Sequence, residues 1–123
     1  MPRKISRKGL IKKLDKVAKE IMFKRDGRHC VMCGSSDKLG WGHVFSSGTH
    51  ATRWDMFNIH VQCWPCNYRH VRDQYPYFEW FENKYGKKAF RELRFRFKNP
   101  KRLTRLDLED KLEELTKLLK EQV

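Results

Sequence analysis

The sequence is 123 residues long, which suits one domain and excludes a multidomain enzyme. Its 28 lysines and arginines outnumber 15 acidic residues, so the formal net charge is +13. Such an excess predicts a polyanionic partner, nucleic acid first, and a hydrophobic content of 39% argues against a disordered chain. No stretch approaches the roughly 20 apolar residues of a membrane span, and the basic start lacks a signal peptide's apolar segment. We therefore expect a cytoplasmic protein with no membrane partner.

The first half of the chain is predicted to contain one long helix followed by two short strands. Apolar residues recur at steps of three and four over residues 9–25, the pattern of an amphipathic helix, and Asp26-Gly27 is a stop signal. Short apolar pieces follow, and the best strand candidates are residues 41–45 and 59–62. The glycines of this segment are expected to make turns: Gly34, Gly40, Gly42 and Gly48.

The second half is predicted to be helical. One helix is expected over residues 65–72, because Pro65 suits a first helical turn, and another over 77–95, with a potential interruption at Gly86. Asn99-Pro100 breaks the chain, and Thr104 with Asp107 resembles the capping pair of a last helix.

Leucines recur along this last helix at steps of four, three and four, at positions 108, 112, 115 and 119. The stripe lasts barely two heptads, which is short for a coiled coil. We therefore favour packing against the domain's own core over a dimer seam, and a homodimer stays an open alternative.

The charge is arranged in blocks along the chain. Residues 1–25 have a net charge of +8 and residues 84–105 one of +9, whereas residues 26–83 are nearly neutral at −1 and residues 106–123 sum to −3. The neutral centre holds all four cysteines and all five histidines. This arrangement is typical of basic docking segments on both sides of a chemical site.

Two Cys-x-x-Cys pairs are separated by 29 residues. Two thiolates at this spacing hold one side of a tetrahedral metal from a tight turn, and thiolate ligands favour Zn²⁺. Disulfides conflict with a reducing compartment, and a thioredoxin-like redox site would need one motif rather than two. We therefore predict a structural zinc ion held by Cys30, Cys33, Cys63 and Cys66.

Polar residues that suit catalysis lie between and just after these pairs. Asn67 and His70 are three residues apart, so on a helix they share a face and could bind one cation. An imidazole beside a divalent cation suffices for phosphodiester hydrolysis, with His43 deprotonating the water. The whole set comprises His43, His50, Arg53, Asp55, Asn58, His60, Asn67 and His70.

These segments resemble the HNH (ββα-metal) nuclease superfamily and, within it, the NinG/Rap recombination endonucleases of bacteriophages. The most demanding piece is Asn58-x4-Cys63-x2-Cys66-Asn67. The other matching segments are Cys30-Val31-Met32-Cys33, Gly42-His43, Thr52-Arg53-Trp54-Asp55, Tyr77 and Lys84-Tyr85-Gly86. The resemblance implies an α+β fold in which a zinc-stabilised ββα-metal core (26–75) lies between a basic N-terminal helix (1–25) and a basic helical part (76–123).

The resemblance also implies roles for individual residues. His43 matches the expected general base, and Asn58 matches an asparagine that orients the base through backbone contacts. Asn67 matches a ligand of the catalytic cation, Mg²⁺ or Mn²⁺. Arg53 is expected near the site, where it could stabilise the scissile phosphate.

The chain departs from the superfamily pattern at Gly42, where many members have an aspartate that binds the cation. Another residue must then supply the second ligand. We expect His70 first, with His43 itself, His50 or Asp73 as alternatives.

The basic block near the C-terminus is expected to contact DNA phosphates, with shape and backbone rather than sequence being recognised. Its phenylalanines, Phe90, Phe95 and Phe97, are expected in the core, and the N-terminal block from Arg3 to Lys24 should add a second track. The expected phosphate contacts are Lys84, Lys87, Lys88, Arg91, Arg94, Arg96, Lys98, Lys101, Arg102 and Arg105.

The resemblance therefore implies a metal-dependent endonuclease that cleaves branched DNA, such as Holliday junctions or D-loops, in the host cytoplasm. Two other functions stay open. One is a zinc-stabilised DNA-binding accessory protein without catalysis, which Gly42 favours, and the other is a general HNH nuclease acting on linear duplex.

Overall fold

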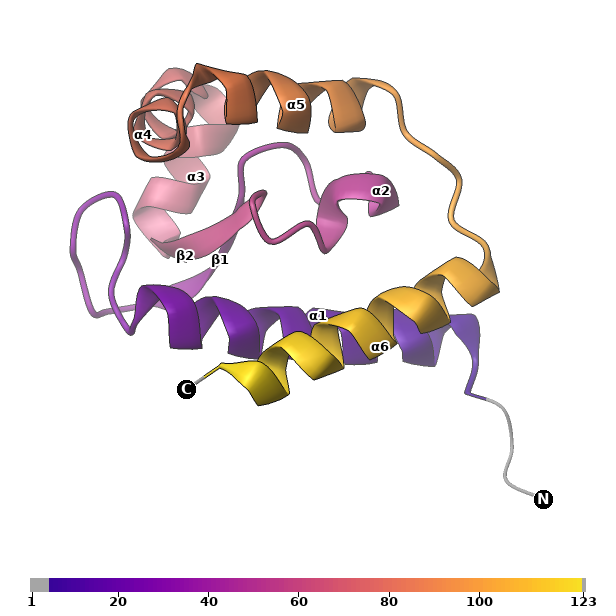
Figure 1. The fold of residues 1–123 in the computed structure, drawn as a ribbon. Coiled ribbons are helices and arrows are strands. Elements are labelled where there is room, and N and C mark those ends of the chain that lie inside the picture. The colour runs from indigo at the N-terminus through magenta and orange to yellow at the C-terminus, as the bar shows by residue number, and fades with distance from the viewer. Residues whose placement is uncertain (1–4, 123) are drawn as a thin grey trace.

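The computed structural model describes residues 5–122 of the chain, which form helices and one two-stranded sheet. Figure 1 shows the sheet between a layer of two helices below it and a second helical layer above it. The mixed α+β class expected from the sequence is confirmed. The elements are α1 (Arg7–Asp26), β1 (Leu39–His43), α2 (His50–Arg53), β2 (Ile59–Cys63), α3 (Trp64–Arg72), α4 (Tyr75–Tyr85), α5 (Lys87–Lys98) and α6 (Arg105–Glu121).

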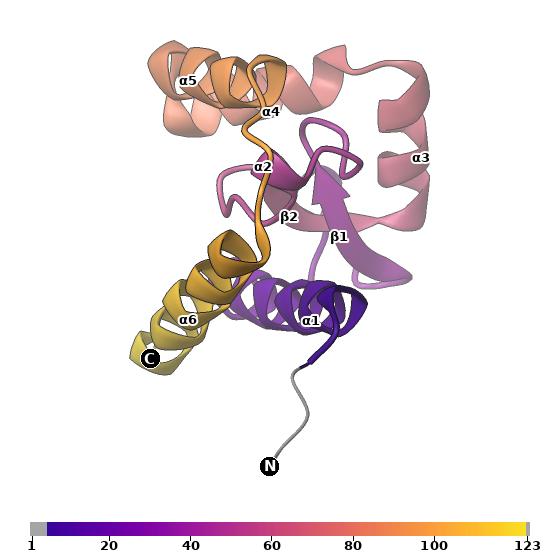
Figure 2. The same cartoon turned by 90° about the vertical axis from the view of Figure 1, so that its right-hand side faces the viewer.

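The first and last helices, far apart in sequence, lie side by side (Figures 1 and 2). The N-cap of α1 is Ser6, whose side chain accepts a hydrogen bond from the Gly9 backbone N–H at 3.0 Å, and its C-cap is Gly27, where φ is 81°. The N-cap of α6 is Thr104, which forms a capping box with Asp107, because the side chain of each accepts a hydrogen bond from the other residue's backbone N–H. Both predicted helices are confirmed, α1 being one or two residues longer at each end.

The leucine stripe of α6 packs inward against α1. Leu108 and Leu115 are buried, and Leu112 and Leu119 pack against the same cluster. From α1 this cluster receives Leu10, Leu14, Ala18, Ile21 and Met22. The stripe therefore packs against the core of the chain itself, as the short repeat indicated.

The helix predicted over 77–95 is formed as two helices, α4 and α5, separated at the potential interruption that the sequence indicated. The break falls at Gly86, whose φ of 94° is a conformation that residues with a side chain rarely adopt. Phe90 and Phe97 pack around Phe45 as expected of core residues, but Phe95 is 67% exposed. The expectation for Phe95 was wrong, because α5 turns positions 90, 93 and 97 inward and leaves position 95 outside.

The two strands pair antiparallel, from Leu39 opposite Cys63 to His43 opposite Ile59. β2 matches its prediction and extends one residue further, whereas β1 lies two residues earlier than expected. Val44 and Phe45 leave the sheet to pack in the upper layer, which shortens β1 at that end. Gly40 and Gly42 therefore lie within a strand and not in turns, contrary to expectation.

The segment between the strands forms one short helix, α2, that the sequence analysis did not predict. α3 follows β2 directly and has Pro65 in its first turn, as predicted. Within residues 5–122, no helix has the length and apolar character needed to cross a membrane.

Candidate functional site

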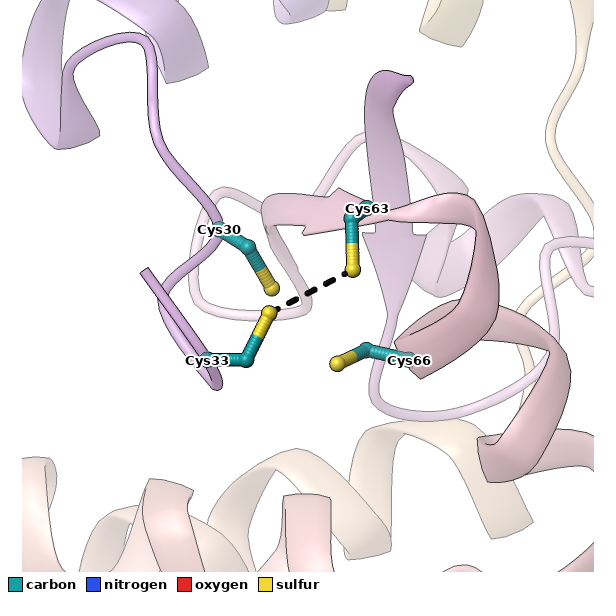
Figure 3. Close-up of side chains that lie close together, drawn as sticks. All are labelled: Cys30, Cys33, Cys63 and Cys66. Atoms are coloured by element: carbon teal, nitrogen blue, oxygen red, sulfur yellow. Dashed lines mark hydrogen bonds between the residues drawn. The ribbon is translucent and has the colours of Figure 1, made fainter. Parts of the chain in front are cut away.

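The four cysteines come together at one point, although they belong to two distant segments. Cys30 and Cys33 lie in the loop after α1, while Cys63 ends β2 and Cys66 lies in the first turn of α3. Their sulfur atoms all lie within 4.8 Å of one another and converge in Figure 3. Four sulfurs around a tetrahedral zinc ion are about 3.8 Å apart, given a Zn–S bond of about 2.3 Å. The predicted grouping of the cysteines is therefore confirmed, and its geometry suits zinc.

The electrostatics of the cluster also favour a bound cation. Burial raises the pKa of the Cys66 thiol, and hydrogen bonding with the other three thiols raises it further. At Cys30, backbone N–H groups outweigh the effect of burial and lower the pKa to about 7. Four thiolates this close repel one another, and a divalent cation allows all of them to ionise. The donor set therefore fits the expected structural zinc.

A cleft of about 490 Å³ lies between β1 and α3. Three of the residues singled out in the sequence line it: His43 from β1, and Asn67 and His70 from α3. The cleft is completed by Trp41, Val44, Ser46, Ser47, Val71 and Gln74. Because α3 starts at the cysteine cluster, a metal ion held there would fix α3 beside His43.

His43 is held in one tautomer by the backbone. Its Nε2 lies 3.0 Å from the carbonyl oxygen of Arg53, which can only accept a hydrogen bond, so Nε2 carries the proton and Nδ1 has the lone pair. Burial lowers the pKa of His43 to about 4, and the charge of Arg53 contributes to the shift. The imidazole is therefore neutral at pH 7 and able to accept a proton.

Asn58 is fully buried and lies outside the lining of the cleft. Its Oδ1 accepts a hydrogen bond from the Phe45 N–H at 2.8 Å, and its Nδ2 donates to the carbonyls of Phe45 and Thr52, each at 2.9 Å. These bonds join the two ends of the segment between His43 and Arg53. Asn58 thus acts on the backbone around His43, which is the kind of contact that the resemblance implied.

The Arg53 side chain is held between α1 and residues that line the cleft. Its guanidinium forms two hydrogen bonds with the carboxylate of Asp15 in α1, at 2.9 and 2.8 Å, and a third with the Ser47 carbonyl at 3.1 Å. Burial alone would raise the pKa of Asp15, but hydrogen bonds from Arg53 and Trp54 outweigh it and lower that pKa. Arg53 contacts His43 through its backbone carbonyl, while its guanidinium bonds to Ser47 and lies 5.4 Å from the ring centroid of Trp41, two residues that line the cleft.

His70 is nearly buried, at 9% exposure, and its Nε2 lies 2.8 Å from the carbonyl oxygen of Val44. Its Nδ1 is a buried atom without a hydrogen-bond partner in the described chain. The two alternative ligands lie elsewhere: His50 contacts Trp54 and lines a different cavity, and Asp73 follows α3 and accepts a hydrogen bond from the Tyr75 N–H.

A buried network that the sequence analysis did not find supports the residue before His43. Tyr77 donates to the Gly42 carbonyl at 2.9 Å and lies 3.0 Å from His60 Nδ1, while His60 Nε2 lies 3.1 Å from the Tyr85 hydroxyl. Burial lowers the pKa of His60 to about 3, so this ring is neutral. No local pattern reveals the network, because its members come from β1, β2 and α4.

Basic side chains gather on two surfaces. A groove of about 640 Å³ follows α1 and is lined by Lys12, Lys16, Lys19, Lys24 and Arg28 among others. On α5, four exposed basic residues recur at steps of four, three and four: Lys87, Arg91, Arg94 and Lys98. Two other members of the predicted set form close ion pairs, Arg96 with Asp55 at 2.8 Å and Arg105 with Glu109 at 2.8 Å. Arg3 and Lys4 of the N-terminal block lie outside the described residues.

The fold and the site together define a small α+β protein in which a four-cysteine cluster anchors a β-hairpin and the following helix beside a histidine-containing cleft. The family model described as "Bacteriophage Lambda NinG protein" matches residues 3–122, and the chain belongs to this family. Membership suggests a function related to phage recombination. No curated protein and no solved structure matches the chain in the comparisons made.

Proposed function

We propose that this protein is a metal-dependent endonuclease of the HNH type that cleaves branched DNA intermediates of recombination by phosphodiester hydrolysis. The observation that carries the proposal is the tautomer of His43 and its position in the cleft. Its Nε2 is held by the Arg53 carbonyl at 3.0 Å, and its unprotonated Nδ1 belongs to a residue that lines the same cleft as Asn67 and His70.

His43 would act as the general base. Nδ1 would take a proton from the water whose oxygen attacks the phosphorus, and the bond from phosphorus to the leaving oxygen would break. A pKa of about 4 keeps the ring unprotonated over the whole neutral range. The Asn58 bonds to the backbone and the Tyr77 bond to the Gly42 carbonyl would hold the ring in place during this step.

Asn67 and His70 would hold the catalytic cation, Mg²⁺ or Mn²⁺. When bound, such a cation would stabilise the negative charge of the phosphate and of the leaving oxygen. The chemistry of the donors fits, because the Asn67 amide oxygen suits a hard cation and the buried Nδ1 of His70 is an acceptor without a donor.

The basic surfaces support DNA as the substrate. Lys19 lies over the ring of Trp41, with Nζ 4.8 Å from the ring centroid, and Trp41 lines the cleft next to His43. The basic groove of α1 therefore continues to the site where the phosphodiester would be cut. Phosphate contacts along such a track position the duplex without reading its sequence.

The test is cleavage of a synthetic four-way junction by zinc-loaded protein with Mg²⁺ or Mn²⁺, compared with a linear duplex of the same arm sequences. Wild type should cut the junction preferentially, and His43→Ala should reduce cutting by at least about 10²-fold while binding is retained. His29→Ala is the matched control, because His29 is an exposed histidine of the loop after α1.

Three outcomes would contradict the proposal in different ways. Junction binding without cutting by any divalent cation would favour a DNA-binding accessory protein, for which the missing side chain at Gly42 is the structural argument. Equal cutting of linear duplex would favour a general HNH nuclease. Full activity of His43→Ala would remove the assigned base.

A further inference from the structure

The side chain of Gln62 fills the space beside Gly42. A Cβ atom built on Gly42 would lie 1.9 Å from Gln62 Oε1, 2.5 Å from its Cδ and 2.8 Å from its Cγ. Gln62 is only 2% exposed, so its amide has little room to move aside. Glycine at position 42 is therefore what allows the Gln62 amide oxygen to lie against the backbone immediately before His43.

This oxygen has no hydrogen-bond partner. Within residues 5–122, four buried side-chain atoms lack a partner, and two of them are Gln62 Oε1 and His70 Nδ1. His70 donates through Nε2 to the Val44 carbonyl, so Nδ1 is an acceptor, as is an amide oxygen. A buried acceptor without a donor destabilises the folded state. A divalent cation bound by both atoms would satisfy both acceptors.

Both acceptors belong to side chains that lie against a residue next to His43. Gln62 lies against Gly42, and His70 bonds to Val44. Tyr77 connects the two places, since its hydroxyl donates to the Gly42 carbonyl and its ring centroid lies 4.9 Å from that of His70. Asn67 shares α3 with His70, one turn earlier, and lines the same cleft as His43.

We propose that Gln62 is a ligand of the catalytic cation and supplies, through Oε1, the oxygen that a side chain at position 42 cannot provide. The cation class is a hard divalent ion, Mg²⁺ or Mn²⁺, because two amide oxygens and one imidazole nitrogen leave the other positions to water and phosphate oxygens. This inference rests on the proposed function in placing a divalent cation in the cleft.

The steric relation gives a reciprocal test. The Cβ atom of an aspartate at position 42 would overlap the Gln62 amide. Once the Gln62 side chain is removed, the carboxylate of that aspartate could place an oxygen near the position that Gln62 Oε1 now occupies. Three variants follow: Gln62→Leu, which removes the oxygen at similar volume; Gly42→Asp, in which the two side chains collide; and Gly42→Asp combined with Gln62→Gly.

The measurement is Mn²⁺ binding to zinc-loaded protein, monitored through the electron paramagnetic resonance signal of free Mn²⁺. It is made with and without bound junction DNA, and all proteins carry His43→Ala. Gln62→Leu should weaken binding by at least about tenfold, and the double variant should recover most of that loss. Gly42→Asp alone should not bind more tightly than wild type. Gln74→Leu is the matched control, because Gln74 is an exposed glutamine that lines the same cleft.

Thermal unfolding without Mn²⁺ separates a ligand from a structural residue. Removing an acceptor that has no partner should leave the unfolding temperature of Gln62→Leu equal to that of wild type or above it, whereas Mn²⁺ should raise the temperature of wild type more than that of the variant. A variant that unfolds earlier without Mn²⁺ yet binds Mn²⁺ normally would overturn the proposal.

The outcomes also separate this proposal from the proposed function. Unchanged Mn²⁺ affinity in Gln62→Leu, with junction cleavage intact, would overturn the role of Gln62 and leave the nuclease standing. Binding of Mn²⁺ that depends on Gln62, in a wild type that cuts no DNA, would support the ligand and defeat the nuclease. Absence of any Mn²⁺ binding, with or without DNA, would overturn the ligand.

Discussion

Asp15 connects the first helix to the candidate base through a single arginine. Its carboxylate pairs with the Arg53 guanidinium and also accepts a hydrogen bond from Trp54 Nε1 at 2.7 Å. The Arg53 carbonyl in turn lies 3.0 Å from His43 Nε2. The side chain of Arg53 thus fixes the position of its own backbone, and we infer that Arg53 is a positioning residue and not a phosphate contact.

This role predicts that Asp15→Asn and Arg53→Lys behave alike. Each breaks the same two-bond pair, which is about one-fifth exposed on both side chains, so each should cost about 1–2 kcal/mol of unfolding free energy. The double variant should cost little more than either single one, because the sites are coupled. Urea denaturation of the four proteins completes the cycle.

Single-turnover cleavage of a junction by the same four proteins tests the alternative. A positioning role predicts that both single variants, when folded, slow cleavage to a similar extent, by less than about tenfold. If Arg53 instead stabilises the scissile phosphate, Arg53→Lys should lose about 10²-fold or more while Asp15→Asn stays close to wild type.

At the scale of single residues, the sequence identifies chemistry that has a fixed spacing. Each Cys-x-x-Cys pair and the pair Asn67 and His70 were predictable, because a turn or a helix brings each pair together. Gln62 was not, since its significance depends on the absence of a side chain at Gly42 on the neighbouring strand. The Asp15–Arg53 pair was also beyond reach, because it joins residues 38 positions apart in sequence.

The cysteine cluster determines how three elements are joined. It links the loop after α1, the end of β2 and the start of α3, and Val31 in the loop also donates its N–H to the Val61 carbonyl of β2 at 2.9 Å. The sheet has only two strands, which are marginally stable alone. The hairpin and α3 therefore depend on whatever holds the four sulfurs together.

Removal of zinc is predicted to unfold this part of the protein. Structural zinc sites contribute on the order of 10 kcal/mol to folding, so an excess of a strong chelator should abolish the cooperative thermal transition, and added Zn²⁺ should restore it. Cys66→Ser should bind zinc more weakly and unfold earlier. Native far-UV circular dichroism and an unchanged transition in excess chelator would contradict a structural zinc.

At the scale of elements, helices were predicted well and the strand ends less well. Thr104 with Asp107 and Asp26-Gly27 are local signals, and both mark real helix ends. The break at Gly86 was visible only as a potential interruption, because glycine permits a φ of 94° without requiring it. Beyond the end of β1, the Phe45 N–H donates a hydrogen bond to Asn58 Oδ1, 13 residues further along the chain, instead of to a neighbouring strand. No local sequence pattern contains that information.

The charge of the whole molecule is distributed on opposite sides of the hairpin. α1 lies on one side of the two strands and α5 on the other in both views of the fold (Figures 1 and 2). The acidic helix α6 packs against α1 and offsets part of its charge. The basic stripe of α5, defined by Lys87, Arg91, Arg94 and Lys98, flanks the inward face that contains Phe90, Leu93 and Phe97. The two basic blocks of the sequence thus remain separate surfaces in the fold.

If the α5 stripe contacts phosphates, its removal should change the salt dependence of DNA binding. Each phosphate contact contributes about −0.9 to the slope of log K against log salt concentration for duplex DNA. Arg91→Ala with Arg94→Ala should therefore make the slope shallower by about 1.8, and should weaken binding equally for different sequences of the same shape. Lys117→Ala with Lys120→Ala is the matched control, since it removes two exposed basic residues from the acidic helix α6. Equal slopes for the two double variants would show that α5 does not lie against the DNA backbone.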